Sequence, residues 1–249
     1  MLSIIVPSIR QHNIIRLIES IDYPDYELII VGPYVKHDLS EYIIQNKLLG
    51  KIKIVTDYGQ ITRAIQIGLT LATGDFITIM CDDGFYHPNH LVNIISLLKE
   101  SSNNTVVTCR YTEHHYNNHP IDYFLLKNAY QPSPSVVKND WFITNFAFFY
   151  RSYLEYLGGI DCKYECGAFA VGADLAVRCY LENANIIFYD EPILHCDWEP
   201  QNPSHKAIEE AQGGPDTQYY IKKTFISKIP FDNWKNTDSI WSRRLNNYV

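Results

Sequence analysis

The chain has 249 residues, of which 46% are hydrophobic and 14% aromatic, and its formal net charge is −7. That composition suits one large globular domain, or one domain with an appendage. Acidic and basic residues are interspersed, and the lack of a basic patch argues against nucleic acid as the main partner. No apolar run approaches the ~20 residues that span a bilayer, and the start lacks a signal-peptide pattern, so we expect a cytoplasmic protein.

β-Branched runs alternate with segments of helical periodicity along the chain. This alternation predicts strands over 2–6, 26–31, 51–55, 76–80, 105–109, 141–151 and 186–189, and helices over 13–21, 39–49, 60–72, 90–98, 152–157 and 174–181. A strand–helix rhythm of this kind is typical of a parallel sheet that is covered on both faces. The periodicity fades from 110 to 138, which predicts a functional loop or lid.

A polar, proline-rich stretch after Trp198 places a boundary near residue 200. Residues 201–249 are expected to form a helical tail that either packs on the domain or forms a partner contact, for example between copies of the chain. The six cysteines are scattered and match no common zinc motif, so reduced thiols are the simplest interpretation.

Two adjacent acids, Asp82 and Asp83, follow the buried strand predicted over 76–80. Such a strand carries them to the carboxyl edge of a sheet, where open α/β sheets bind their ligands. Carboxylate oxygens suit Mg²⁺ or Mn²⁺, and such a cation suits a diphosphate. The structural alternative is a solvated turn with two acids near a helix N-terminus, where Asp is favoured in any case.

Six segments, in this order and spacing, carry a resemblance to a known family. They are SIIVPSIR (3–10), ELIIVG (27–32), AIQIGLTLATGDFITIMCDD (64–83), LGGIDCKY (157–164), GADLAVRCYLENANI (172–186) and PILHCDW (192–198). Together they resemble the GT-A inverting nucleotide-sugar glycosyltransferases of the large family 2 type. The resemblance covers roughly residues 1–196.

The resemblance implies an α/β GT-A fold with a mostly parallel, Rossmann-like central sheet flanked by helices. It places a glycosyltransferase domain at 1–200, with a nucleotide-sugar half at about 1–110 and an acceptor half at about 111–200, followed by a helical extension at 201–249. It implies a metal-dependent inverting transferase that moves a sugar from a nucleoside-diphosphate sugar, by default a UDP-sugar, to a hydroxyl of a glycan or other acceptor.

The resemblance also assigns roles to individual residues. Metal ligands for Mn²⁺ or Mg²⁺ would be Asp82, Asp83 and His195. The general base would be Asp174, with Asp161 in reserve, and Arg178 at i+4 would hold Asp174 ionised. The donor nucleotide would be bound by Pro7, Ser8, Arg10, Asp57, Gln60, Arg63, Cys81 and Asp82.

Each of these residues also has a structural interpretation. Asp174 fits the N-cap of a helix, His195 fits a strand-end histidine that is satisfied locally, and Arg63 fits a surface ion pair. Trp141, Asn145 and Trp198 are candidates for sugar or acceptor contacts, although buried aromatics are the commoner explanation for the two tryptophans.

The sequence departs from the family pattern at several positions. Strand 26–31 ends in Gly32-Pro33, where the family often has an Asp that contacts the base. Met80 replaces the first acid of the metal motif, and Val171-Gly172 replaces an acidic pair near the expected base.

Two alternatives therefore stay open. A non-catalytic relative that binds a sugar nucleotide is compatible with the lost acids. A sugar nucleotidyltransferase would want a glycine-rich basic loop after the first strand, which Pro7–Arg10 does not provide.

Overall fold

The computed structural model describes residues 1–9, 13–33, 37–114, 120–123, 144–196, 210, 212–224 and 226–233. Runs of aliphatic and β-branched residues form its central strands, because such side chains pack well on a pleated, buried surface. The strands are β1 (Leu2–Pro7), β2 (Tyr26–Gly32), β3 (Ile52–Thr56), β4 (Phe76–Ile79), β5 (Gly84–Tyr86), β6 (Thr105–His114), β7 (Pro120–Tyr123), β8 (Phe148–Tyr150) and β9 (Asn185–Cys196).

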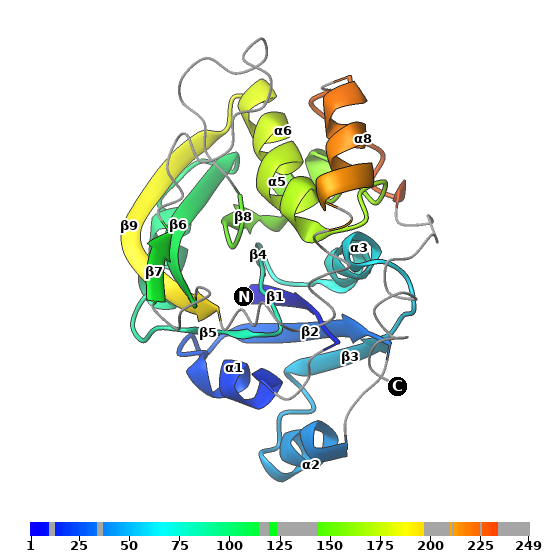
Figure 1. Ribbon diagram of the computed structural model, residues 1–249. Coiled ribbons are helices and arrows are strands. Elements are labelled where there is room, and N and C mark those ends of the chain that lie inside the picture. The colour runs from blue at the N-terminus through cyan, green and yellow to red at the C-terminus, as the bar shows by residue number, and fades with distance from the viewer. Residues whose placement is uncertain are drawn as a thin grey trace.

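These strands make one curled sheet in the order β3-β2-β1-β4-β8-β6-β9-β5, with β7 paired to β6 (Figure 1). Strands β3, β2, β1 and β4 run parallel, as the strand–helix rhythm predicted. The expectation of a mostly parallel sheet is wrong for the second half, where β8 is antiparallel to both β4 and β6, and β5 is antiparallel to β9. The fold is therefore a mixed α/β fold.

Helices cover both faces of this sheet. They are α1 (Ile14–Ser20), α2 (His37–Gln45), α3 (Ile61–Leu71), α4 (Leu91–Lys99), α5 (Arg151–Tyr156), α6 (Leu175–Leu181) and α8 (Thr217–Lys222), with π-helical segments η2 (Ala168–Asp174) and η3 (Gln212–Asp216). Alternate residues of β1 enter two separate cores, since successive strand side chains point to opposite faces. Ile4 packs in the core that α1 and α4 cover, and Ile5 packs in the core beneath α3, α5 and α6.

The stretch expected to be irregular, 110–138, is partly regular. Strand β6 continues to His114 and pairs with β7, while 115–119 and 124–138 lie outside the described residues. Strand β9 runs unbroken through Pro192, although the sequence suggested an interruption there. A register irregularity opposite Arg110 accommodates this proline, which cannot donate to a regular ladder.

The expected helical tail is only partly tested, because 201–209 and 234–249 lie outside the described residues. The described part contains η3 and α8, and α8 packs against η2, the segment that leads into α6. The proposed boundary near 200 stays a prediction. In the portions of the chain that the structure describes, no helix is both long and apolar enough to cross a membrane.

A buried carboxylate, Glu27 on β2, fixes the turn that leads into β4. The side chain is 4% exposed, accepts a hydrogen bond from the Ser3 hydroxyl at 2.6 Å and pairs with the Lys53 ammonium at 2.7 Å. It also accepts hydrogen bonds from the backbone and side chain of Thr73 and from the Gly74 amide. Burial opposes ionisation of Glu27, but Lys53, Ser3 and Thr73 together lower its pKa to about 2.

We predict that Glu27→Gln lowers the free energy of unfolding at pH 7 by about 2 kcal/mol, through loss of charged hydrogen bonds. Because the folded-state pKa is depressed from 4.5 to about 2, the stabilisation is present above pH 4.5 and is lost as the pH falls toward 2. Denaturant unfolding between pH 7 and pH 3 should show the two proteins converging, with the exposed Glu100→Gln as control. A constant gap across this range would contradict the role given to Glu27.

Candidate functional site

The sheet brings Asp82 beside the loop that follows β1. Strand β4 lies parallel to β1, with Ile5 opposite Ile79, so both chains leave the sheet at the same edge. The Ile9 amide then donates a hydrogen bond of 2.9 Å to Asp82 Oδ2. Asp82 is 4% exposed and Asp83 6%, so neither acid sits on a solvated turn, as the structural alternative required. Two adjacent carboxylates are thus held almost buried at the ligand-binding edge.

Strand β5, which the sequence did not predict, connects these acids to His195. It follows Asp83 directly and pairs with β9, so that Phe85 lies opposite His195. The Phe85 and His195 rings are 5.3 Å apart between centroids. His195 Nδ1 is 2.7 Å from the Thr112 hydroxyl, a contact that fixes the orientation of the ring. A segment more than 100 residues away in sequence is therefore brought next to the acidic pair.

The donor types partly fit the implied cation. Two buried carboxylates and an oriented imidazole are ligands that Mn²⁺ accepts, and the carboxylates alone also suit Mg²⁺. Within the described residues, however, no group of three or more His, Cys, Asp or Glu side chains is arranged to hold a metal. Metal binding by Asp82, Asp83 and His195 therefore stays a prediction.

Cys81 lies against a second thiol, and its predicted nucleotide contact stays a prediction. Its Sγ lies 3.3 Å from Cys196 Sγ. That contact, burial and the nearby Asp83 carboxylate raise the Cys81 pKa well above its ordinary value, so the group is a neutral thiol.

Asp57 and Arg63 form an ion pair at the end of β3. The Asp57 carboxylate is 3.0 Å from both Nε and Nη2 of Arg63, and it also accepts the Gly59 amide at 2.9 Å. A Cβ at Gly59 would lie 2.2 Å from Arg63 Cδ, so a glycine at this position leaves room for the arginine side chain. The pair is half-buried at the predicted nucleotide edge, and it agrees with the ion-pair interpretation of Arg63.

The other nucleotide candidates have different surroundings. Pro7 ends β1 as a buried residue, and Arg10 lies outside the described residues. The Ser8 hydroxyl is buried and has no hydrogen-bond partner among the residues that the structure describes. Gln60 is 3% exposed and donates to the Cys162 carbonyl, so its amide holds the 157–164 loop. The nucleotide role of these residues stays a prediction.

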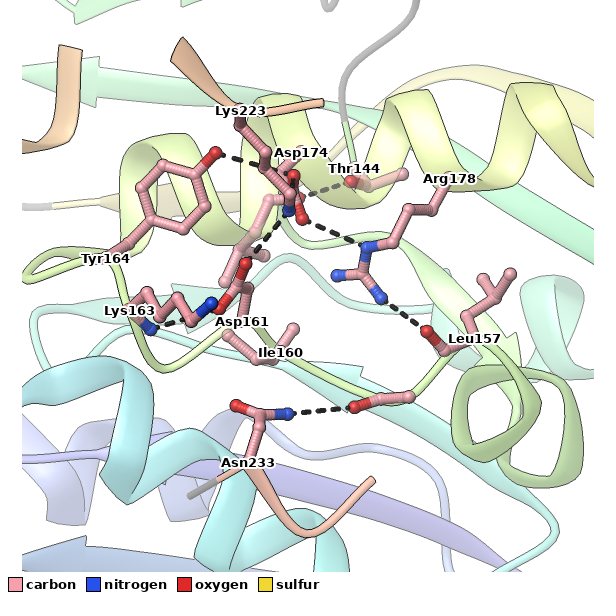
Figure 2. Close-up of polar contacts among 12 residues, drawn as sticks. Thr144, Leu157, Ile160, Asp161, Lys163, Tyr164, Asp174, Arg178, Lys223 and Asn233 are labelled. Carbon is pink, nitrogen blue, oxygen red and sulfur yellow. Dashed lines mark hydrogen bonds and ion pairs between the residues drawn. The ribbon is translucent and has the colours of Figure 1, made fainter. Parts of the chain in front are cut away.

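The two candidate bases lie together in a buried ionic cluster (Figure 2). Asp174 is 1% exposed, and its Oδ2 accepts Arg178 Nε at 3.0 Å, as the i+4 spacing predicted. Asp161 is 3% exposed and lies 2.9 Å from the Lys223 ammonium, which also pairs with Asp174. No local pattern indicated a role for Lys223, because it lies 49 residues from Asp174 in the expected tail.

Both carboxylates are paired with buried cations. Burial opposes ionisation of Asp161, but Lys223, the Lys163 amide and the Tyr219 hydroxyl outweigh it, and the pKa lies below its ordinary value. A base works best with a pKa near the working pH. At the positions of the lost acidic pair, the Val171 and Gly172 carbonyls both accept bonds from Thr144. The base assignment stays a prediction. The ion pairs with Lys223 and Arg178 favour a structural role for Asp161 and Asp174.

Asn145 and the two tryptophans at 141 and 198 are the remaining candidates for sugar or acceptor contacts. Asn145 approaches the Gly172 backbone, where an added Cβ would lie 2.8 Å from its Oδ1. Trp141 and Trp198 lie outside the described residues.

The chain resembles solved glycosyltransferase structures in fold. S. aureus TarS gives a TM-score of 0.58 at 14% identity, covering 84% of this chain but 39% of TarS, so the chain spans well under half of that protein. The TarS 1–349 structure gives a TM-score of 0.62, and the same fragment in complex with UDP gives 0.58; both have 14% identity and cover 99% of this chain and 71% of the fragment. Identities this low show the fold alone.

A search of curated protein sequences finds no match. The model of the family described as "Glycosyl transferase family 2" matches residues 3–170. This span runs from β1 through the acidic pair to the 157–164 loop. The chain therefore belongs to glycosyl transferase family 2.

Proposed function

We propose that this protein transfers a sugar from a UDP-sugar to a hydroxyl of a glycan or other acceptor, with inversion at the anomeric carbon. The observation that carries the proposal is the burial of Asp82 and Asp83 at the carboxyl edge of β4, where the Ile9 amide holds Asp82 in place. The similarity in fold to a TarS structure titled as a UDP complex supports the choice of nucleotide.

In this proposal the diphosphate lies between the loop after β1 and the acidic pair. Asp82 and Asp83, with His195, would hold a divalent cation, which when bound neutralises charge on the leaving diphosphate. The Ser8 hydroxyl supplies an unused buried donor at the same edge. The Asp57–Arg63 pair lies at the end of the neighbouring strands, where it would face the nucleoside. The sheet holds these groups in place before the substrate binds. In this proposal they orient the donor without having to rearrange.

Inversion requires the acceptor oxygen to attack the anomeric carbon opposite the departing UDP, while a base takes the hydroxyl proton. The new carbon–oxygen bond forms as the bond to the β-phosphate oxygen breaks. The sequence nominated Asp174 and Asp161 as the base, and both are already neutralised by buried cations. Each can nevertheless be tested directly by substitution.

We predict that Asp82→Asn and Asp83→Asn each lower Mn²⁺-dependent turnover of UDP-sugars by about 100-fold or more, because a lost metal–phosphate contact removes several kcal/mol of transition-state stabilisation. Donors are screened by UDP release, with and without EDTA and with Mn²⁺ added back. Asp190→Asn, an acid on β9 with 70% side-chain exposure, serves as the control and should keep wild-type turnover. Activity that survives both EDTA and Asp82→Asn would exclude the metal-dependent proposal.

We predict that Asp174→Asn lowers the free energy of unfolding by about 3–5 kcal/mol, since it leaves the fully buried Arg178 without its carboxylate. Asp161→Asn should act in the same direction. Unfolding in denaturant and kcat are measured on the same preparations. If either variant keeps wild-type stability but loses more than about 100-fold in kcat, that residue is the general base and its structural role is refuted.

A further inference from the structure

The 157–164 loop lies between the C-terminal segment and the carboxyl edge of the parallel strands, where the nucleotide is proposed to bind. Helix α3 begins just after Asp57, and its first turns hold the loop from one side. Gln60 donates to the Cys162 carbonyl, Thr62 donates to the Tyr164 carbonyl at 2.7 Å, and the Gln66 side-chain oxygen Oε1 accepts the Ile160 amide at 2.7 Å. A shift of this loop would therefore break or distort its hydrogen bonds to the start of α3.

The C-terminal segment, 216–233, holds the same loop from the other side. Asp216 accepts the Glu165 and Cys166 amides at 2.7 and 3.0 Å, and Asn233 accepts the Cys162 amide at 2.8 Å. The Ile229 amide donates to the Leu157 carbonyl at 3.2 Å. Gly158 has a φ of +91°, and an added Cβ would lie 2.0 Å from the Ile229 carbonyl oxygen, so the loop backbone is fitted to this segment.

Lys223 is the charged contact between the C-terminal segment and the 157–164 loop. It follows α8 and lies between Asp161 and Asp174, with its side chain 6% exposed (Figure 2). Together with Arg178 it balances two buried carboxylates with two buried cations. Removing one member of such a set leaves an uncompensated charge in the interior. Asp161 itself belongs to the loop, so the lysine fixes the loop directly.

We infer that Lys223 is a positioning residue for sugar transfer, acting through Asp161 on the 157–164 loop, and that segment 216–233 is part of the transferase site. The inference rests on the proposed function. The described contacts of this segment complete a loop that abuts the edge of the sheet where the nucleotide is proposed to bind.

The test compares Lys223→Met with Lys223→Arg and with the control Lys222→Met, which replaces an exposed neighbour. Amide hydrogen exchange reports on residues 157–166 without any need for turnover. For Lys223→Met we expect faster exchange there, a kcat lowered by about tenfold or more, and a UDP dissociation constant within about twofold of wild type. Lys223→Arg should restore exchange and kcat substantially, and Lys222→Met should match wild type.

A double variant keeps the inference testable if Lys223→Met folds poorly. Adding Asp161→Asn removes one buried negative charge, so Lys223→Met with Asp161→Asn should recover protection of residues 157–166 relative to Lys223→Met alone. Wild-type exchange in Lys223→Met, no rescue by arginine and by the double variant, or equal losses in kcat and UDP binding would overturn the inference. A wild-type protein without turnover of any UDP-sugar would instead refute the proposed function and leave the exchange result standing.

Discussion

The candidate site depends on the parallel pairing of β4 with β1. This pairing makes two chain segments leave the sheet together, so that the Ile9 amide meets Asp82 across 73 residues of sequence. Glu27 supports the arrangement from the opposite end by fixing the turn before β4. If the register of β4 moved by one residue, the acids would change faces of the sheet and lose the loop after β1.

The second half of the fold places further residues at the same edge of the sheet. Strand β9 returns parallel to β6, and its end carries His195 to β5 and the acidic pair. On the other side, the 157–164 loop is held between α3 and the C-terminal segment. The charge in this region is distributed in two ways. We propose that the buried acids at residues 82 and 83 bind a cation at the diphosphate, whereas those at 161 and 174 pair with Lys223 and Arg178.

Local patterns in the sequence predict much of this architecture. Strands β1 to β4 and helix α3 follow from aliphatic runs and helical spacing, and the Asp174–Arg178 pair follows from an i+4 interval. Strand β5 escaped prediction because three residues carry no periodicity and their partner lies far along the chain. The role of Lys223 could not be predicted either, since only tertiary packing places a lysine of the tail between two distant carboxylates. The mixed direction of the second half also depends on tertiary pairing, which local propensity does not encode.

A crystal structure of the protein with UDP and Mn²⁺ would decide whether the acidic pair binds the diphosphate. We expect the diphosphate between the loop after β1 and the acidic pair, with the cation bound by Asp82 or Asp83 and the nucleoside toward Asp57 and Arg63. UDP bound at another surface, or at this edge with no cation on either acid, would contradict it.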